Sequence, residues 1–252
     1  MKRSLQRWLA SHPLSYRNLL RALDRGSLEK HVFLSLIGSE DVVCDIGANQ
    51  GHFTQLFSDL VGSKGQVHAF EPGPAIEKLR IIMTDGTFNN TTITNAGLSD
   101  TAGKATLLVP GDANGQASLR SQQAGCWADG AEVVKHPCRL LTLDDYAAGF
   151  SRLDFIKCDI EGAELPCMRG AKSTLMKFQP LLFLEVCEEW TRSFGYNALD
   201  LIAFLREAGY DHFIVAAEKL TTLEAADFST SLNLLCGIRE KHSKQFSQLK
   251  GL

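Results

Sequence analysis

The chain has 252 residues, of which 44% are hydrophobic and 22% are charged, and its formal net charge at pH 7 is -3. This size and composition fit one globular domain and exclude a disordered or fibrous class. No apolar run reaches the roughly 18 residues of a membrane-spanning helix, and the slight negative charge excludes nucleic acid as the favoured partner. The N-terminus also lacks the regions of a secretory signal, so we expect a cytoplasmic location.

Residues 1–30 form a basic segment ahead of an acidic body, because they hold seven Lys or Arg and only two acidic residues. Apolar residues at helical spacing predict two short amphipathic helices on either side of Pro13. We expect residues 1–40 to form a helical cap over the sheet or the cofactor cleft, and residues 41–252 to form the main domain. Alternatively, apolar side chains on these helices contact an anionic membrane, a partner or a second copy in a homodimer.

From Asp41 onward, short apolar runs alternate with helical stretches, which is typical of βαβ units. This pattern predicts an α/β fold with a doubly wound, mostly parallel, seven-stranded sheet and helices on both faces. The predicted strands are residues 42–46, 66–70, 91–94, 154–160, 180–186, 212–215 and 233–238. The predicted helices are residues 51–60, 75–83, 163–176 and 198–208.

Two segments depart from this alternation. Residues 106–140 carry glycines, among them Gly125, between β-like runs at 105–109 and 132–140, and we interpret them as an insertion near the mouth of the cleft. Residues 239–252 are polar and predict a frayed helix.

The cysteines predict reduced thiols and not disulfides, because their number, seven, is odd. No pair has metal-ligand spacing, so they do not predict a metal site either. Those in apolar, strand-like runs should be buried: Cys44, Cys158, Cys187 and Cys236.

The segment Asp45-Ile46-Gly47-Ala48-Asn49-Gln50-Gly51 follows the first strand and predicts a cofactor site. Ligands of open α/β sheets bind beyond the carboxyl ends of the strands, and Gly47 and Gly51 let the backbone approach them closely. The spacing does not match the glycine pattern of dinucleotide-binding proteins. Asp45 would repel a phosphate but suits an ammonium and a sulfonium, so we expect S-adenosylmethionine. A nicotinamide cofactor on an oxidoreductase is the alternative.

Glu71 ends the next strand, 20 residues after Gly51. A carboxylate at this place accepts hydrogen bonds from both ribose hydroxyls of a nucleoside cofactor. The alternative is that Glu71 is an acid in contact with solvent at the end of a strand.

The segment Asp159-Ile160-Glu161-Gly162-Ala163-Glu164 ends a later strand and brings three acids together around a glycine. Here the sequence resembles the FkbM family of class I methyltransferases, over roughly residues 41–238. The other motifs that carry the resemblance are the Asp45 segment, Phe70-Glu71-Pro72, Asn95-Ala96-Gly97-Leu98-Ser99-Asp100, Thr142-Leu143-Asp144-Asp145, Arg169-Gly170-Ala171, and Gln179-Pro180 before a strand ending in Glu185.

The resemblance implies an S-adenosylmethionine-dependent methyltransferase that acts on a hydroxyl of a sugar, polyketide or similar acceptor, although N-methylation also occurs within such a family. It places the cofactor against Asp45, Gly47, Asn49, Gly51 and Glu71. The adenine would lie beside Asn95, Gly97 and Leu98.

For catalysis we expect Asp159 or Glu161 to remove the proton of the acceptor hydroxyl, because both follow the strand where the acceptor must lie. The alternative is that Asp159 holds cofactor or backbone groups, while Glu161 and Glu164 stabilise a helix N-terminus. Carboxylates could also hold Mg²⁺, but carboxylates alone are a weak metal signal, and we expect no metal. A binding protein that kept the fold without catalysis is a further alternative.

Overall fold

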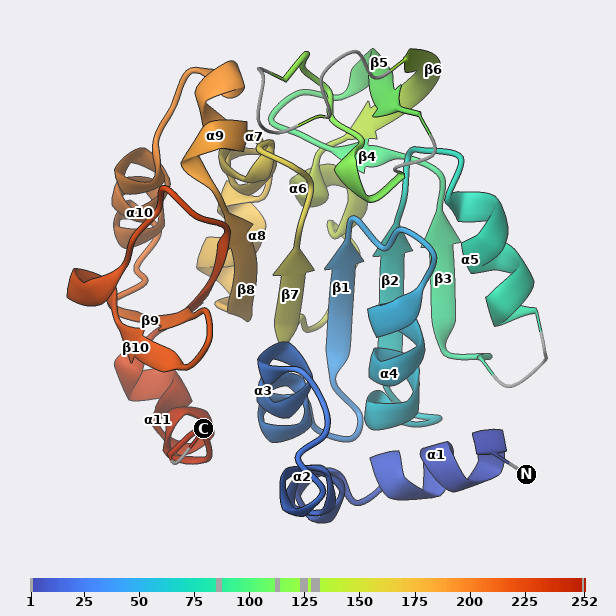
Figure 1. Ribbon diagram of the computed structural model, residues 1–252, viewed down its shortest axis with the longest axis vertical. Helices are drawn as coiled ribbons and strands as arrows, with labels where there is room; N and C mark the ends of the chain where they lie inside the picture. The colour runs from blue at the N-terminus through green and yellow to red at the C-terminus, as the bar shows by residue number, and fades with distance from the viewer. Residues whose placement is uncertain (1, 85–87, 112–113, 123–126, 128–131, 251) are drawn as a thin grey trace.

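A computed structural model of the chain (Figure 1) describes residues 2–84, 88–111, 114–122, 127, 132–250 and 252. The strands of the main sheet are β1 (Val42–Ile46), β2 (Gln66–Phe70), β3 (Thr91–Thr94), β7 (Phe155–Cys158), β8 (Leu181–Val186), β9 (His212–Ala216), β10 (Leu220–Thr222) and β11 (Leu232–Gly237). A second sheet contains β4 (Gly97–Leu98), β5 (Gly103–Pro110) and β6 (Val133–Leu141).

The α-helices are α1 (Lys2–Ala10), α2 (Pro13–Ala22), α3 (Leu28–Leu36), α4 (His52–Val61), α5 (Ile76–Met83), α6 (Leu143–Tyr146), α7 (Glu164–Arg169), α8 (Lys172–Phe178), α9 (Glu188–Thr191), α10 (Ala198–Glu207) and α11 (Arg239–Ser247). Short 3₁₀ helices are η1 (Asn114–Gln116), η2 (Arg192–Phe194) and η3 (Leu223–Ala225).

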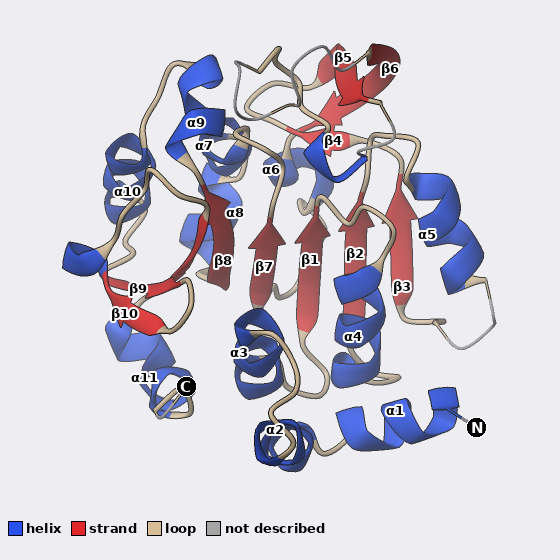
Figure 2. Cartoon of the chain, in the orientation of Figure 1, coloured by secondary structure: helices blue, strands red, loops and turns tan. Residues whose placement is uncertain are grey.

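The main sheet has eight strands in the order β10-β9-β11-β8-β7-β1-β2-β3, with helices on both faces (Figure 2). Strands β8, β7, β1, β2 and β3 pair in parallel, whereas β11 is antiparallel to β8 and β9. The predicted doubly wound, mostly parallel fold is therefore confirmed. The sheet exceeds the predicted seven strands because residues 220–222 pair with β9, and a three-residue strand gives too short a pattern to recognise.

Strands of the parallel region are buried on both faces, which explains their continuous apolar runs. All five residues of β1 are buried, and their side chains alternate between two apolar clusters. Cys44 and Ile46 belong to one cluster, and Val43 belongs to the other. The polar residues needed for chemistry are thereby restricted to the strand ends. The thiols of Cys44, Cys158, Cys187 and Cys236 are buried and free, as predicted.

The predicted helix over residues 163–176 is divided into α7 and α8 at Gly170. A side chain on Gly170 would collide with the carbonyl oxygen of Ser99, so the chain packs there against another loop. Asp144 then caps α8, because its carboxylate accepts hydrogen bonds from Ser173 N at 3.0 Å and Thr174 N at 2.7 Å.

The predicted insertion forms the second sheet, in which β5 is antiparallel and β4 parallel to β6. Figure 1 shows this sheet beyond the carboxyl ends of β7, β1, β2 and β3. Gly125 lies outside the described residues.

The N-terminal helices lie at the other end of the main sheet, far from the second sheet (Figure 1). Phe33 of α3 makes edge-on contacts with Phe57, Phe155 and Phe183, at ring-centre distances of 4.8 to 5.8 Å. These contacts fix α3 against one face of the sheet. No helix within the described part of the chain is long and apolar enough to cross a membrane.

Candidate active site

A pocket with about 680 Å³ of empty space lies at the carboxyl ends of β1, β2 and β7. The first strand ends and their turns contribute Ile46, Gly47, Asn49, Phe70, Glu71 and Pro72. The second sheet and its connections contribute Gly97, Leu98, Leu107, Gly115, Ala117 and Leu119, and the acidic segment contributes Asp159, Ile160, Glu161 and Ala163. The fold therefore unites the three motifs found in the sequence.

The turn after β1 is held by main-chain contacts that only glycine permits. Gly47 has a φ of 79°, and the amide groups of Gly47 and Ala48 both donate to Phe70 O at 3.0 Å. A Cβ on Gly47 would collide with the carbonyl oxygen of Asp159. Gly47 therefore brings the turn after β1 against the acidic segment after β7.

Glu71 lies in the pocket wall with only 8% of its surface exposed. Its Oε2 accepts a hydrogen bond from Asn49 N at 2.9 Å, and its Oε1 accepts one from Gly73 N at 2.7 Å. Burial raises the pKa of Glu71, while these two amide groups act to lower it. A carboxylate has about four acceptor positions, so Glu71 retains capacity for two hydroxyl donors.

Asp45 lies beneath the turn and is not among the residues that line the pocket. It is 1% exposed, and its Oδ2 accepts a hydrogen bond from Thr54 Oγ1 at 2.6 Å. Its Oδ1 is 3.8 Å from Lys157 Nζ and has no hydrogen-bond partner among the described residues. Burial raises the pKa of Asp45, and the Lys157 ammonium opposes that shift.

The other residues expected around the cofactor divide into two groups. Gly97 and Leu98 line the pocket, whereas Asn95 is exposed and is not among the lining residues. Gly51 also lies outside the lining; it precedes α4 with a φ of 87°. A Cβ on Gly51 would lie 2.5 Å from Leu79 Cδ1, so this glycine permits close packing of α4 and α5.

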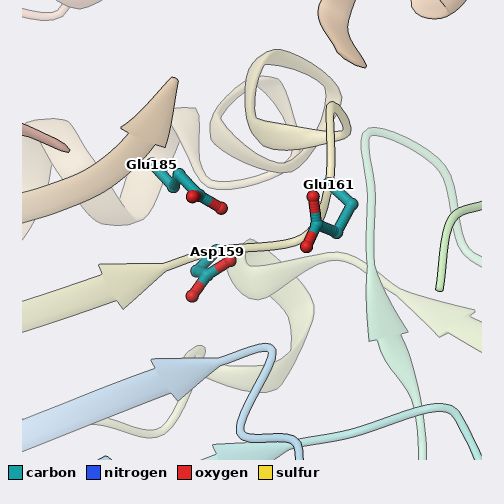
Figure 3. Close-up of side chains that lie close together, drawn as sticks. All are labelled: Asp159, Glu161 and Glu185. Atoms are coloured by element: carbon teal, nitrogen blue, oxygen red, sulfur yellow. The ribbon is translucent and has the colours of Figure 1, made fainter. Parts of the chain in front are cut away.

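The acidic segment after β7 places Asp159 and Glu161 in the pocket wall. Figure 3 shows both side chains beside Glu185 at the end of β8, and their carboxylate oxygens lie within 4.8 Å of one another. Lys157 Nζ contacts Asp159 Oδ2 at 3.0 Å. The buried Lys157 ammonium therefore lies near both carboxylates, Asp159 and Asp45.

The protonation of these acids follows from their surroundings. Burial, together with the nearby Glu185 and Asp159 carboxyl groups, raises the pKa of Glu161 to about 9. Burial and Asp159 raise the pKa of Glu185 to about 9. Burial also acts to raise the pKa of Asp159, but the Lys157 ammonium and the neighbouring Glu185 carboxyl group act to lower it, and the pKa of Asp159 is lowered overall. Near neutral pH, Asp159 is therefore ionised while Glu161 and Glu185 hold protons.

Glu164 faces the backbone of its own turn. Its Oε1 accepts hydrogen bonds from Ile160 N at 3.0 Å and Gly162 N at 3.3 Å. Tyr196 Oη lies 3.2 Å from Glu164 Oε2 and 2.8 Å from Gly162 O. Burial raises the pKa of Glu164 to about 7. These contacts agree with the alternative in which Glu164 stabilises the start of a helix.

Sequence reasoning missed Lys157 and two residues of the insertion. A single lysine within an apolar strand was the available signal for Lys157, because a buried charge needs a partner.

The insertion contributes two further residues that the sequence did not reveal. Ser118 Oγ donates to Glu161 O at 3.0 Å. Gln122 Nε2 donates to Ser118 Oγ at 2.9 Å and to Ser193 Oγ at 3.0 Å. The insertion is therefore bonded to the acidic segment and to η2, contacts between distant parts of the sequence that no local pattern reveals.

The fold and the pocket together agree with the class of S-adenosylmethionine-dependent methyltransferases. Residues 45–211 match the family model described as the methyltransferase FkbM domain. This match covers more than half of the chain, so the chain belongs to the FkbM methyltransferase family. The expected family, enzyme class and cofactor are confirmed, which sets aside the nicotinamide oxidoreductase.

Solved structures resemble the chain to different degrees. The methyltransferase FkbM from Methylobacillus flagellatus KT is 21% identical with a TM-score of 0.50, and the match covers 78% of this chain and 43% of that chain. An S-adenosylmethionine-dependent O-methyltransferase from Thermotoga maritima is 14% identical with a TM-score of 0.48, covering 88% of this chain and 70% of that chain. This chain therefore spans less than half the length of the Methylobacillus protein. No curated protein sequence matches the chain significantly.

The residues present fit the cofactor. Asn49 lines the pocket, and its buried Oδ1 has no hydrogen-bond partner among the described residues. A Cβ on Gly115 would lie 3.3 Å from Asn49 Nδ2, so the glycine leaves the space beside this amide open. Together with the spare acceptor positions of Glu71, these features provide acceptors for the polar groups of a nucleoside.

Proposed function

We propose that the protein transfers the methyl group of S-adenosylmethionine to a hydroxyl of a small-molecule or glycan acceptor, such as a sugar or a polyketide. The observation that carries this proposal is that Asp159 and Glu161 line the same pocket as Gly47, Asn49 and Glu71. Groups suited to a nucleoside and groups suited to proton transfer thus share one cavity.

For the cofactor, we assign the ribose hydroxyls to Glu71 and the adenine to the wall formed by Gly97 and Leu98, beside the turn at Gly47 and Asn49. Asp45, Gly51 and Asn95 lie outside the lining, and we assign them no direct contact with the cofactor. The Asp45 carboxyl group also lies beneath the turn, where its ionised form favours a positively charged ligand above it.

S-adenosylmethionine supplies an electrophilic methyl group. The side chains of the pocket align the acceptor oxygen with this group and exclude water. Asp159, which stays ionised beside Lys157, accepts a hydrogen bond from the acceptor hydroxyl. Glu161 in its ionised form takes the hydroxyl proton as the new bond forms, because its raised pKa of about 9 makes it the stronger base of the two.

Calorimetry with S-adenosylmethionine, S-adenosylhomocysteine and NAD tests the cofactor assignment, and micromolar binding of the two adenosyl ligands alone is expected. A screen of sugars and polyketide-type alcohols, with S-adenosylhomocysteine release and product mass as readouts, then tests the acceptor class. Methylation of nitrogen would contradict the hydroxyl assignment. Cofactor binding without any methylated product would favour the non-catalytic binding protein.

Three further expectations from the sequence stay predictions: a cytoplasmic location, a homodimer, and the division into an extension of residues 1–40 and a main domain of residues 41–252. Exposed apolar side chains on α1 and near the end of α2, such as Trp8 at 61% and Leu23 at 55%, support a contact surface there. Light scattering of the purified chain measures its oligomeric state.

A further inference from the structure

Asp159 and Glu185 lie at the ends of the neighbouring parallel strands β7 and β8, and their carboxylate oxygens come within 4.8 Å of each other. Figure 3 shows their carboxyl groups facing each other. Two ionised carboxylates this close repel each other, and one proton between them replaces the repulsion with a hydrogen bond. The pair therefore holds a single negative charge.

Lys157 decides which acid is ionised. Its ammonium lies 3.0 Å from Asp159 Oδ2, whereas Glu185 forms no ion pair within the described residues. The hydroxyl of Ser231 donates to Glu185 Oε1 at 2.6 Å, which supplies a dipole but no positive charge. An adjacent ammonium favours the ionised form of Asp159, so the proton belongs to Glu185.

The other charged groups around the pair support this arrangement. Glu164 acts to raise the pKa of both Glu161 and Glu185, while Asp45 lies beyond Lys157. The raised pKa of Glu185, about 9, and the lowered pKa of Asp159 agree with a proton on Glu185.

We propose that Glu185 is a positioning residue, which donates a hydrogen bond through the shared proton and, opposite Lys157, holds the Asp159 carboxylate in one orientation. The inference rests on the proposed function, in which Asp159 accepts a hydrogen bond from the acceptor hydroxyl. With Glu161 and Glu185 protonated, Asp159 is the one ionised acid of this cluster, and the Lys157 ammonium lies near both Asp159 and Asp45. The acceptor side of the pocket then presents one carboxylate that accepts a hydrogen bond, which suits a hydroxyl compound.

A carboxyl ¹³C NMR titration of the protein labelled at Asp and Glu tests the proton assignment without any acceptor. In the wild-type protein, Glu185 and Glu161 are expected to titrate near pH 9, and Glu185→Gln removes one of these two transitions. Asp159→Asn should return the pKa of Glu185 toward its usual range, because the negative charge beside it is lost. A Glu185 that titrates near its usual value of about 4.3 in the wild-type protein would overturn the proposal.

Glu185→Gln and Glu185→Leu separate positioning from packing. The glutamine amide can donate to Asp159 and accept from Ser231, so methyl transfer at pH 7 should stay within about threefold of wild type. The leucine lacks both groups, and kcat should fall at least tenfold with the Kd for S-adenosylmethionine unchanged. Glu189→Gln, at an exposed acid nearby, is the matched control.

Equal loss in both variants, or normal kcat in Glu185→Leu, would overturn the positioning role. Because the NMR experiment does not require turnover, it separates this inference from the proposed function. A Glu185 transition near pH 9 in a protein that methylates no acceptor would refute the proposed function and leave the shared proton established.

Discussion

The carbonyl oxygen of Asp159 occupies the space that a Cβ on Gly47 would need. The turn after β1 and the segment after β7 therefore touch through their backbones, without side chains between them. The proposed cofactor side and the proposed acceptor side of the pocket meet at this contact.

This contact predicts that Gly47→Ala disrupts the site, through both a positive φ of 79° and the steric collision. Gly195→Ala is the matched control, because Gly195 has a φ of 76° and a Cβ there would meet no described atom within 4 Å. The control should lose about 1 to 3 kcal/mol of unfolding free energy from backbone strain alone. Gly47→Ala should lose more, and should bind S-adenosylmethionine more weakly by calorimetry. Equal behaviour of the two variants would contradict the close contact.

Glu71→Ala should weaken S-adenosylmethionine binding tenfold or more, because a hydrogen bond to a charged group contributes about 1.5 to 3 kcal/mol. Isothermal calorimetry of the folded variant measures the change. Glu77→Ala, at an exposed acid that pairs with Arg80 on α5, should bind normally. Unchanged affinity in Glu71→Ala would remove the ribose assignment.

Glu161→Gln should lower kcat by roughly two to four orders of magnitude while the cofactor Kd stays the same, if Glu161 is the base. Since the pKa of Glu161 is about 9, the wild-type rate should rise as pH increases from 6 toward 9 and the ionised fraction grows. The rise should be absent in Glu161→Gln. A wild-type rate that is flat over this range would point to Asp159 as the base.

Stability should fall as the pH rises. The folded-state pKa of Glu161 lies above its unfolded value, so the folded chain binds the additional proton. The associated stabilisation is complete below about pH 4.3 and is lost progressively as the pH rises through about 9. Thermal unfolding should therefore show a Tm advantage of Glu161→Gln over wild type that is larger at pH 9 than at pH 5. A constant difference would contradict the raised pKa.

Exhaustive EDTA treatment should leave methyl transfer intact. Asp159, Glu161 and Glu185 are close enough together to hold a cation, but Lys157 already supplies a positive charge at 3.0 Å from Asp159. Loss of activity that added Mg²⁺ restores would show that the acceptor oxygen is polarised by a metal.

The sequence predicted the parts of this site that depend on strand ends. Buried parallel strands read as apolar runs, so Asp45, Glu71 and Asp159 stood out as the acids that follow them. The pairing of Asp45 with Lys157 could not be predicted, because these residues are neighbours only in the register of β1 with β7. The exposure of Asn95 could likewise not be predicted, since it depends on how the chain turns between β3 and β4.

The segment of residues 114–122 covers the pocket from outside the main sheet. It supplies Gly115, Ala117 and Leu119 to the wall, and it is held by the hydrogen bonds of Ser118 and Gln122. Because its residues do not belong to the strands that hold the core, it can be exchanged without altering those strands, provided that Gly115 is kept beside Asn49. Grafting this segment, with Gly115, Ser118 and Gln122 kept, is therefore a direct route to changing which acceptor the enzyme takes.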